Sequence, residues 1–114
     1  MALVFVNWEL SATTEAEKES MTSLVTAAVV KNSNAKGALV AFQDMKCYPA
    51  APGPVIFVNW TEGQLPQVKD AMVQGITEAV CTATGVSPKG VKIIFNDVPR
   101  GDLGNDGRII NRNK

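Results

Sequence analysis

The sequence predicts an α+β fold in which two tandem β-α-β units form a four-stranded sheet with two helices on one face. The tetrapeptide Phe-Val-Asn-Trp occurs at residues 5–8 and again at residues 57–60. Each copy precedes an amphipathic helical pattern and a second apolar run, and such a fixed-offset repeat indicates a duplicated structural unit. A chain of 114 residues is the size of one domain. We therefore expect a single domain made of residues 1–49, a linker of small and helix-breaking residues at 50–53, and residues 54–114.

The first unit begins with the apolar residues 3–6, a run without polar alternation that is typical of a strand buried on both faces. A helix should follow, because apolar residues recur there at intervals of three and four and so share one face. Thr14, with Glu17 three residues later, predicts a capping box at its start. Residues 38–42 form the second apolar run and the second expected strand. The helix residues expected to face the core are Met21, Leu24, Val25, Ala28 and Val29.

The second unit repeats this order, with strands expected at residues 55–58 and 91–95. Pro66 suits the first turn of the helix between them, and Gly85 suits the left-handed residue that follows its last turn. Residues 99–107 contain three glycines and predict a hairpin or a loop that crosses to a neighbouring subunit. The helix residues expected to face the core are Leu65, Val68, Met72, Ile76, Ala79, Val80 and Ala83.

The expected sheet has apolar strands on both faces but helices for only one of them. The uncovered face should therefore be buried against another copy of the chain, and we expect an oligomer.

Composition excludes several classes of function. The 11 basic and 11 acidic residues balance, so no overall charge favours nucleic acid or an anionic membrane. The apolar run at residues 2–6 is too short for a signal peptide or a membrane span, and we expect a cytoplasmic protein. The absence of histidine excludes Ser-His-Asp and Cys-His catalytic sites. Cys47 and Cys81 lack metal-ligand spacing and are interpreted as small apolar side chains, so we expect neither a metal site nor a cofactor.

Residues 54–63 begin with a proline, continue through an apolar strand and end in Glu-Gly. Together with Val-Lys-Ile-Ile at residues 91–94 and the glycine-rich hairpin, they resemble 4-oxalocrotonate tautomerase, and the whole chain resembles a fused, double-length member of the tautomerase superfamily. The resemblance covers residues 54–107 without gaps and implies the fold shared with macrophage migration inhibitory factor. It also implies a trimer that mimics a hexamer of single units, and a small anionic 2-oxo or enol acid as substrate.

In that superfamily the amine of an N-terminal proline moves a proton between carbon and oxygen of the substrate, while arginines hold its carboxylate and stabilise the enolate oxygen. Here the matching Pro54 lies within the chain, so its nitrogen is an amide and cannot act as a base. The repeat partner of Pro54 is Ala2, which has a free amine only if Met1 is removed. The resemblance therefore implies Ala2 as the catalytic residue of a member that lacks the N-terminal proline.

The resemblance also assigns the substrate-binding positions. The arginine after the Glu-Gly turn corresponds to Gln64, which is neutral, and the arginine of the second strand corresponds to Lys92, which keeps a charge but loses the two-pronged contact. The aromatic residue of the hairpin corresponds to Leu103. A pocket headed by Ala2 would draw Gln64 and Lys92 from the second unit, whereas one headed by Pro54 would draw neutral residues from the first and is expected to be inactive.

Three functions remain open from the sequence. The first is a weak tautomerase that uses the Ala2 amine. The second is a catalytically silent trimer, either a pseudoenzyme or a binding protein. The third is another reaction of a small oxo acid, such as decarboxylation or hydration.

Overall fold

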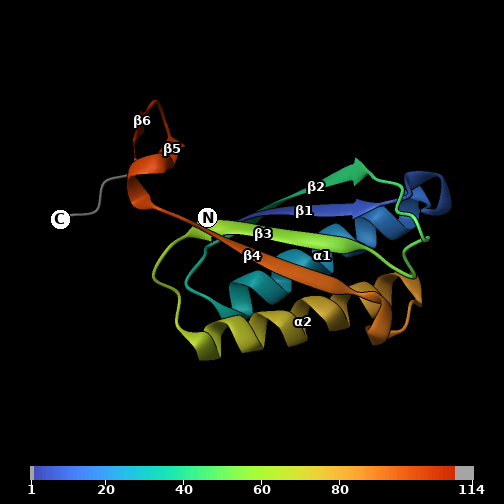
Figure 1. Ribbon diagram of the computed structural model, residues 1–114. Helices are drawn as coiled ribbons and strands as arrows, with labels where there is room; N and C mark the ends of the chain where they lie inside the picture. The colour runs from blue at the N-terminus through green and yellow to red at the C-terminus, as the bar shows by residue number, and fades with distance from the viewer. Residues whose placement is uncertain (1, 110–114) are drawn as a thin grey trace.

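A computed structural model describes residues 2–109 and has the predicted α+β architecture, with two helices packed on one face of a four-stranded sheet (Figure 1). The strand order is β2-β1-β3-β4, in which β1 pairs parallel with β2, β3 pairs parallel with β4, and β1 and β3 are antiparallel at the centre. The two β-α-β units thus lie side by side, joined through their first strands. The strands are β1 (Ala2–Trp8), β2 (Ala38–Asp44), β3 (Val55–Thr61) and β4 (Lys92–Val98), and the helices are α1 (Glu15–Asn32) and α2 (Pro66–Thr84).

The repeated tetrapeptide forms the junction between the two units. The Nδ2 atom of Asn7 donates a hydrogen bond of 2.9 Å to the Val55 carbonyl, and Nδ2 of Asn59 donates one of 3.1 Å to the Leu3 carbonyl. Each asparagine therefore binds the strand of the other unit, which is the relation expected between two copies of one unit joined by a local two-fold axis.

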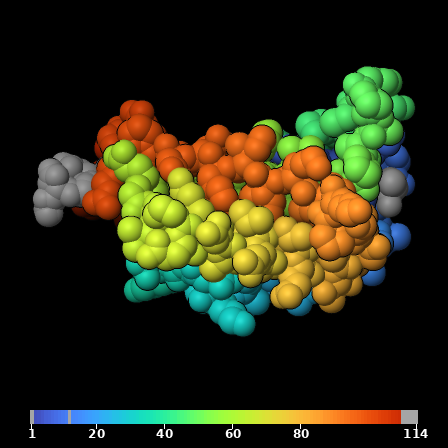
Figure 2. Space-filling view, turned by 60° about the horizontal axis from the view of Figure 1, so that its bottom comes forward, coloured from blue at the N-terminus to red at the C-terminus, as the bar shows by residue number. Residues whose placement is uncertain are grey.

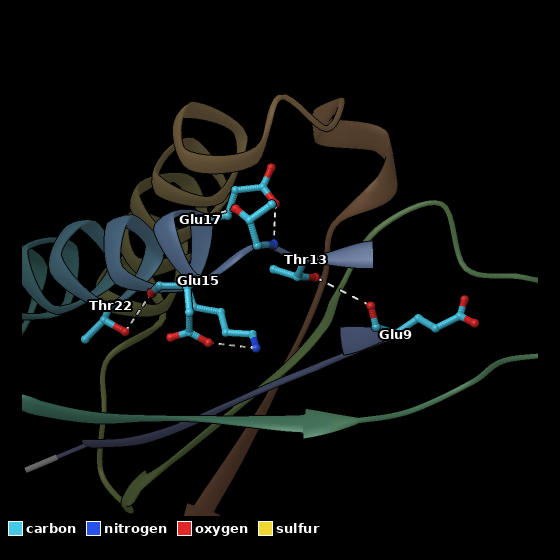
Figure 3. A network of polar contacts seen from close by, with 7 residues as sticks. Glu9, Thr13, Glu15, Glu17 and Thr22 are labelled. Atoms are coloured by element: carbon cyan, nitrogen blue, oxygen red, sulfur yellow. Dashed lines mark hydrogen bonds and ion pairs between the residues drawn. The ribbon is translucent and has the colours of Figure 1, made fainter. Parts of the chain in front are cut away.

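Helix α1 begins with the predicted capping box. The Glu17 amide donates to the Thr14 hydroxyl at 3.1 Å, and the Thr14 amide donates to the Glu17 carboxylate at 2.9 Å. Figure 3 shows Glu17 turned back towards the start of the helix, and Thr13 directed at the Glu9 carbonyl, to which its hydroxyl donates at 3.5 Å. These contacts satisfy amides that a helix start leaves unpaired, and they tie α1 to the segment that follows β1.

Helix α2 begins and ends at the predicted residues. Pro66 occupies its first turn, and Gly85 follows its last turn in the left-handed region with φ of 80° and an amide that donates to the Cys81 carbonyl at 2.8 Å. Leu65 was expected in the core, but it precedes the helix and is 57% exposed. That part of the prediction is wrong because the helical periodicity begins only after Pro66. Across residues 2–109, no helix combines the length and the apolar character that crossing a membrane requires.

The hydrophobic core lies between the helices and one face of the sheet. It takes alternate residues of the two central strands and the predicted faces of both helices, while Leu24, Ala28, Val68 and Ala83 are half-buried around its margin. The buried apolar residues are Ala2, Val4, Val6, Met21, Val25, Val29, Ile56, Val58, Trp60, Met72, Ile76, Ala79 and Val80.

The two outer strands extend further than their apolar runs. β2 continues to Asp44, and β4 begins at Lys92, just after the predicted start at residue 91, and continues to Val98. The residues beyond the apolar runs are polar and exposed, apart from the half-buried Val98. They remain strand because their pairing with Trp8 and Thr61 of the central strands continues to the end. Apolar content therefore marked where these strands are buried and not where they stop.

The opposite face of the sheet is open in a single chain. A row of apolar residues crosses it, with Phe5 opposite Ala41 and Phe57, and Phe57 opposite Ile94. Phe5 and Phe57 are half-buried, whereas Ile94 is 49% exposed and Leu39 is 58% exposed. This is the face that the predicted homotrimer would cover.

Two segments project from opposite ends of the molecule. One is the segment that follows β4, which contains a 3₁₀ turn (Arg100–Asp102) and a small hairpin of β5 (Gly104–Asn105) and β6 (Arg108–Ile109), so the predicted hairpin is confirmed. The other is the segment between β2 and β3, where Tyr48 is 84% exposed. In Figure 2 these segments stand out in red and green at the two ends of the helical layer.

Candidate active site

A cavity of about 130 Å³ lies at the start of β1. Because β1 and β3 are antiparallel, the start of β1 lies beside the end of β3, and the turn after α1 closes the third side. The cavity therefore brings together residues from both units, as a pocket headed by Ala2 requires. Its lining residues are Ala2, Ser33, Asn34, Ala35, Trp60, Thr61 and Gln64.

Ala2 and Gln64 are the two predicted site residues that the structure brings together. Ala2 is fully buried, with its side chain on the helix side of the sheet. Gln64 is half-buried, and its amide group donates to the Thr61 carbonyl at 3.1 Å. The position matched to an arginine thus holds a side chain whose amide nitrogen is already paired within its own loop.

Lys92 and Leu103 do not line this cavity. Lys92 pairs with Val55, at the end of the sheet away from the start of β1, and its ammonium group donates to the Lys89 carbonyl at 3.1 Å. Within one chain the structure therefore separates Lys92 from Ala2. Leu103 is half-buried and follows the turn after β4, at the same end of the sheet as Ala2.

The end of the sheet that carries Pro54 is closed by backbone. Pro54 is fully buried, and its carbonyl accepts the Lys92 amide at 3.1 Å. Gly53 packs against a 3₁₀ turn (Pro88–Gly90) so tightly that a Cβ atom on Gly53 would lie 2.5 Å from the Gly90 carbonyl oxygen. The amide nitrogen of Pro54 is thus held in a packed crossing of two chain segments.

A cluster of charged and aromatic side chains lies behind Trp60 and was not predicted. The Trp60 indole Nε1 donates to Asp97 Oδ1 at 2.8 Å, and Lys69 Nζ donates to Asp97 Oδ2 at 2.6 Å. The Trp60 ring stacks on Phe95 with 5.2 Å between centroids, and Lys69 Nζ lies 5.8 Å from the Phe95 centroid.

The hydrogen bond from Lys69, aided by that from the Trp60 indole, lowers the pKa of the Asp97 carboxyl below its ordinary value, although partial burial acts in the opposite direction. The cluster had a signal in the sequence. Each unit pairs a strand-end tryptophan with an aspartate, Trp8 with Asp44 and Trp60 with Asp97, so extending the repeat comparison to these aspartates would have indicated it.

Ligands for a metal ion are not clustered in the part of the chain that the structure describes, where no group of three or more Cys, Asp or Glu residues is placed to hold one. Cys47 and Cys81 are free and half-buried, so neither belongs to the hydrophobic core.

The family profile described as "Tautomerase enzyme" matches residues 54–113. A probable tautomerase of Ralstonia nicotianae is 34% identical over 56 residues, which cover 49% of this chain and 86% of that protein. The family match covers the second unit, the part of the chain in which the resemblance was continuous.

Solved structures match over both units. The fused 4-OT protein R7, an asymmetric trimer, has a TM-score of 0.84 and 19% identity, with 95% of each chain covered. A native fused 4-OT has a TM-score of 0.80 and 19% identity, covering 96% of this chain and 94% of that one. Protein N1, a member of the cis-3-chloroacrylic acid dehalogenase family, has a TM-score of 0.81 and 17% identity, covering 96% and 83%. At these identities the similarity concerns the fold.

Proposed function

The chain belongs to the tautomerase family, and on this premise we propose that it is a weak or vestigial keto-enol tautomerase that acts on a small 2-oxo or enol acid through the amine of Ala2. The observation that carries the proposal is the cavity at the start of β1, where buried Ala2 meets polar groups of Gln64 and Thr61. Removal of Met1 would place a primary amine at this cavity. An unperturbed α-amino group has a pKa of about 7.7–8.0, so a useful fraction is unprotonated near neutral pH.

In the proposed reaction the neutral amine takes the proton from the enol hydroxyl and returns a proton to the neighbouring carbon, so that the enol becomes the 2-oxo acid and the amine is restored. The second N–H of the Gln64 amide, which is not the one bonded to the Thr61 carbonyl, and the Thr61 hydroxyl can donate hydrogen bonds to the developing oxyanion. These donors are neutral, and the absence of one preorganised donor or charge costs about 2.7–4 kcal/mol of transition-state stabilisation, which is the reason to expect a weak enzyme.

A homotrimer is part of the proposal. The apolar row through Phe5 and Phe57 needs a covering surface, and fused 4-OT relatives are described as symmetric or asymmetric trimers. Lys92 is exposed at the end of the sheet away from Ala2. It can supply the cation for a substrate carboxylate only if it comes from a neighbouring subunit.

A catalytically silent trimer is the second candidate, and one observation favours it. None of the described residues that line the cavity is charged. A pocket of this kind can bind a small polar molecule without providing the positive charge that enolate formation needs.

The test compares the parent with Ala2→Pro and Pro54→Ala, after intact-protein mass spectrometry has established whether Met1 is removed. Ala2→Pro should raise ketonisation of a small enol acid, followed by loss of its ultraviolet absorbance, because it places a secondary amine in the cavity. Pro54→Ala is the matched control and should leave the rate unchanged. Rates that persist after acetylation of the amine, or that vanish in a folded Pro54→Ala protein, would show that the chemistry lies elsewhere.

A further inference from the structure

Trp60 is the one large aromatic side chain among the described residues that line the Ala2 cavity. The other lining residues are alanine, serine, threonine, asparagine and glutamine. It is 3% exposed, so almost its whole ring is in contact with protein. The space beside it is small, about 130 Å³, and part of its boundary is open to solvent. The ring is therefore the bulkiest part of the wall that a molecule in this cavity would meet.

The ring is fixed on its edge and on its face. Asp97 accepts the indole N–H at 2.8 Å, and Phe95 stacks on the ring at an interplanar angle of 16°. Asp97 is itself held by the Lys69 ammonium at 2.6 Å. A tryptophan side chain has two rotatable bonds, so a hydrogen bond at one edge and a stacked face together leave it a single orientation.

The other unit shows that this arrangement is not simply a property of the repeat. Trp8 and Asp44 occupy the corresponding paired positions, but Asp44 Oδ1 accepts the backbone amide of Leu10 at 3.0 Å. Trp8 is half-buried and lies at the opposite end of β1 from Ala2. The aspartate thus fixes the indole of Trp60, which lines the Ala2 cavity, whereas Asp44 of the first unit binds a backbone amide.

We infer that Trp60 sets the length of the acid that the Ala2 cavity admits, and that Asp97 and Lys69 are positioning residues that hold the indole in place. The inference rests on the proposed function for the ligand class and adds a limit to it. The cavity should bind short 2-oxo acids more tightly than longer ones, since one methylene group that does not fit a pocket costs about tenfold or more in discrimination.

Calorimetric titration with 2-oxo acids of three to six carbons tests this limit on the full chain. The parent should bind 2-oxopropanoate more tightly than 2-oxohexanoate. Trp60→Phe should move that affinity ratio at least tenfold towards 2-oxohexanoate, because the smaller ring opens the wall. Trp8→Phe is the matched control, an identical change in the repeat-related tryptophan, and should leave the ratio unchanged.

The positioning role is tested with two substitutions of Asp97. Asp97→Asn keeps an oxygen that can accept the indole N–H and should retain most of the length preference. Asp97→Ala removes the acceptor and should weaken that preference as Trp60→Phe does. The indole N–H resonance of Trp60, assigned by its absence in Trp60→Phe, should move upfield in Asp97→Ala and remain near its parent position in Asp97→Asn.

The outcomes separate the two proposals. If no acid binds the parent or the Trp8→Phe protein, the proposed function is wrong and this inference falls with it. If the acids bind every variant with one common length preference, the proposed class of ligand stands and the inference alone is overturned. If Trp60→Phe loses the circular dichroism of the parent, the decision rests on the comparison of Asp97→Ala with Asp97→Asn.

Discussion

Replacing Phe57 by aspartate should dissociate the proposed trimer without unfolding the chain. Phe57 lies at the centre of the apolar row on the open sheet face and is half-buried in a single chain. A phenylalanine side chain buries roughly 150–250 Å² when fully covered. Most of this area is already covered in the single chain, so at most about 70 Å² remains for a partner to cover. At about 25 cal/mol per Å² this area stabilises the assembly by at most about 1.8 kcal/mol for each Phe57.

Three copies of Phe57 contribute at most about 5.4 kcal/mol to a trimer, and at 1.4 kcal/mol for each tenfold change this equals up to about four powers of ten in its dissociation constant. Burial of the new carboxylate adds a further cost. A trimer that assembles at micromolar concentration should therefore be monomeric at micromolar concentration once Phe57→Asp is introduced.

Light scattering coupled to size-exclusion chromatography measures this directly, with circular dichroism as the check on folding. Val73→Asp is the matched control, since Val73 is 39% exposed on α2, the helical side of the molecule, and its change should leave the mass at three chains. A parent protein that is a stable monomer at micromolar concentration, or a folded Phe57→Asp protein with the parent's mass, would refute the reasoning.

Three further predictions test the closed end of the sheet, the Asp97 cluster and the proposed cation. Gly53→Ala should lower the free energy of unfolding by about 1–3 kcal/mol in urea, because its Cβ would meet the Gly90 carbonyl at 2.5 Å, whereas Gly37→Ala, with open space around it, should be nearly neutral. The pKa of Asp97 is lowered in the folded chain, so its carboxylate stabilises the fold at pH values above the unfolded pKa of about 3.9, and this stabilisation is lost as the pH falls through the folded pKa. Below pH 4 the free energy of unfolding should therefore fall more steeply with decreasing pH in the parent than in Asp97→Asn. Lys92→Ala should weaken binding of 2-oxopropanoate in calorimetry, whereas Lys31→Ala, which removes an exposed lysine of α1, should not. Equal affinities of the two variants would show that Lys92 is a solvated surface residue without a role in binding.

Most of the fold follows from local patterns in the sequence. The repeated Phe-Val-Asn-Trp fixed the pairing of two like units, and Thr14, Glu17, Pro66 and Gly85 marked helix ends because each satisfies or replaces a backbone group that a helix end leaves unpaired. Leu65 was wrongly assigned to the core because it is apolar and fits the helical spacing, although it lies just before the first residue of α2.

The candidate site was less predictable because its residues depend on how segments far apart in the sequence meet. The antiparallel pairing of β1 with β3 brings Ala2 to Gln64. The repeat indicated this meeting, because two like units place residues of one unit in the pocket headed by the other. Lys92 was assigned to the site by its place in a sequence motif. A motif does not show whether Lys92 reaches the pocket of its own chain or that of a neighbouring subunit. Asp97 and Lys69 meet 28 residues apart across a helix and a strand, and only the register of β4 shows that they do.

The duplication explains how the two ends of the sheet came to differ. In an assembly of single units, every copy of the first strand would have the same surroundings, so a change that closed one pocket would close all of them. In this chain Ala2 and Pro54 occupy equivalent positions of the two units, but they are different residues of the sequence and can change independently. The Pro54 end is sealed by the crossing of Gly53 and Gly90, whereas the Ala2 end keeps a cavity walled by a locked tryptophan. The Ala2 end has room for a small molecule and the Pro54 end is closed by backbone, and we therefore expect the start of β1 to be where the function of this chain is found.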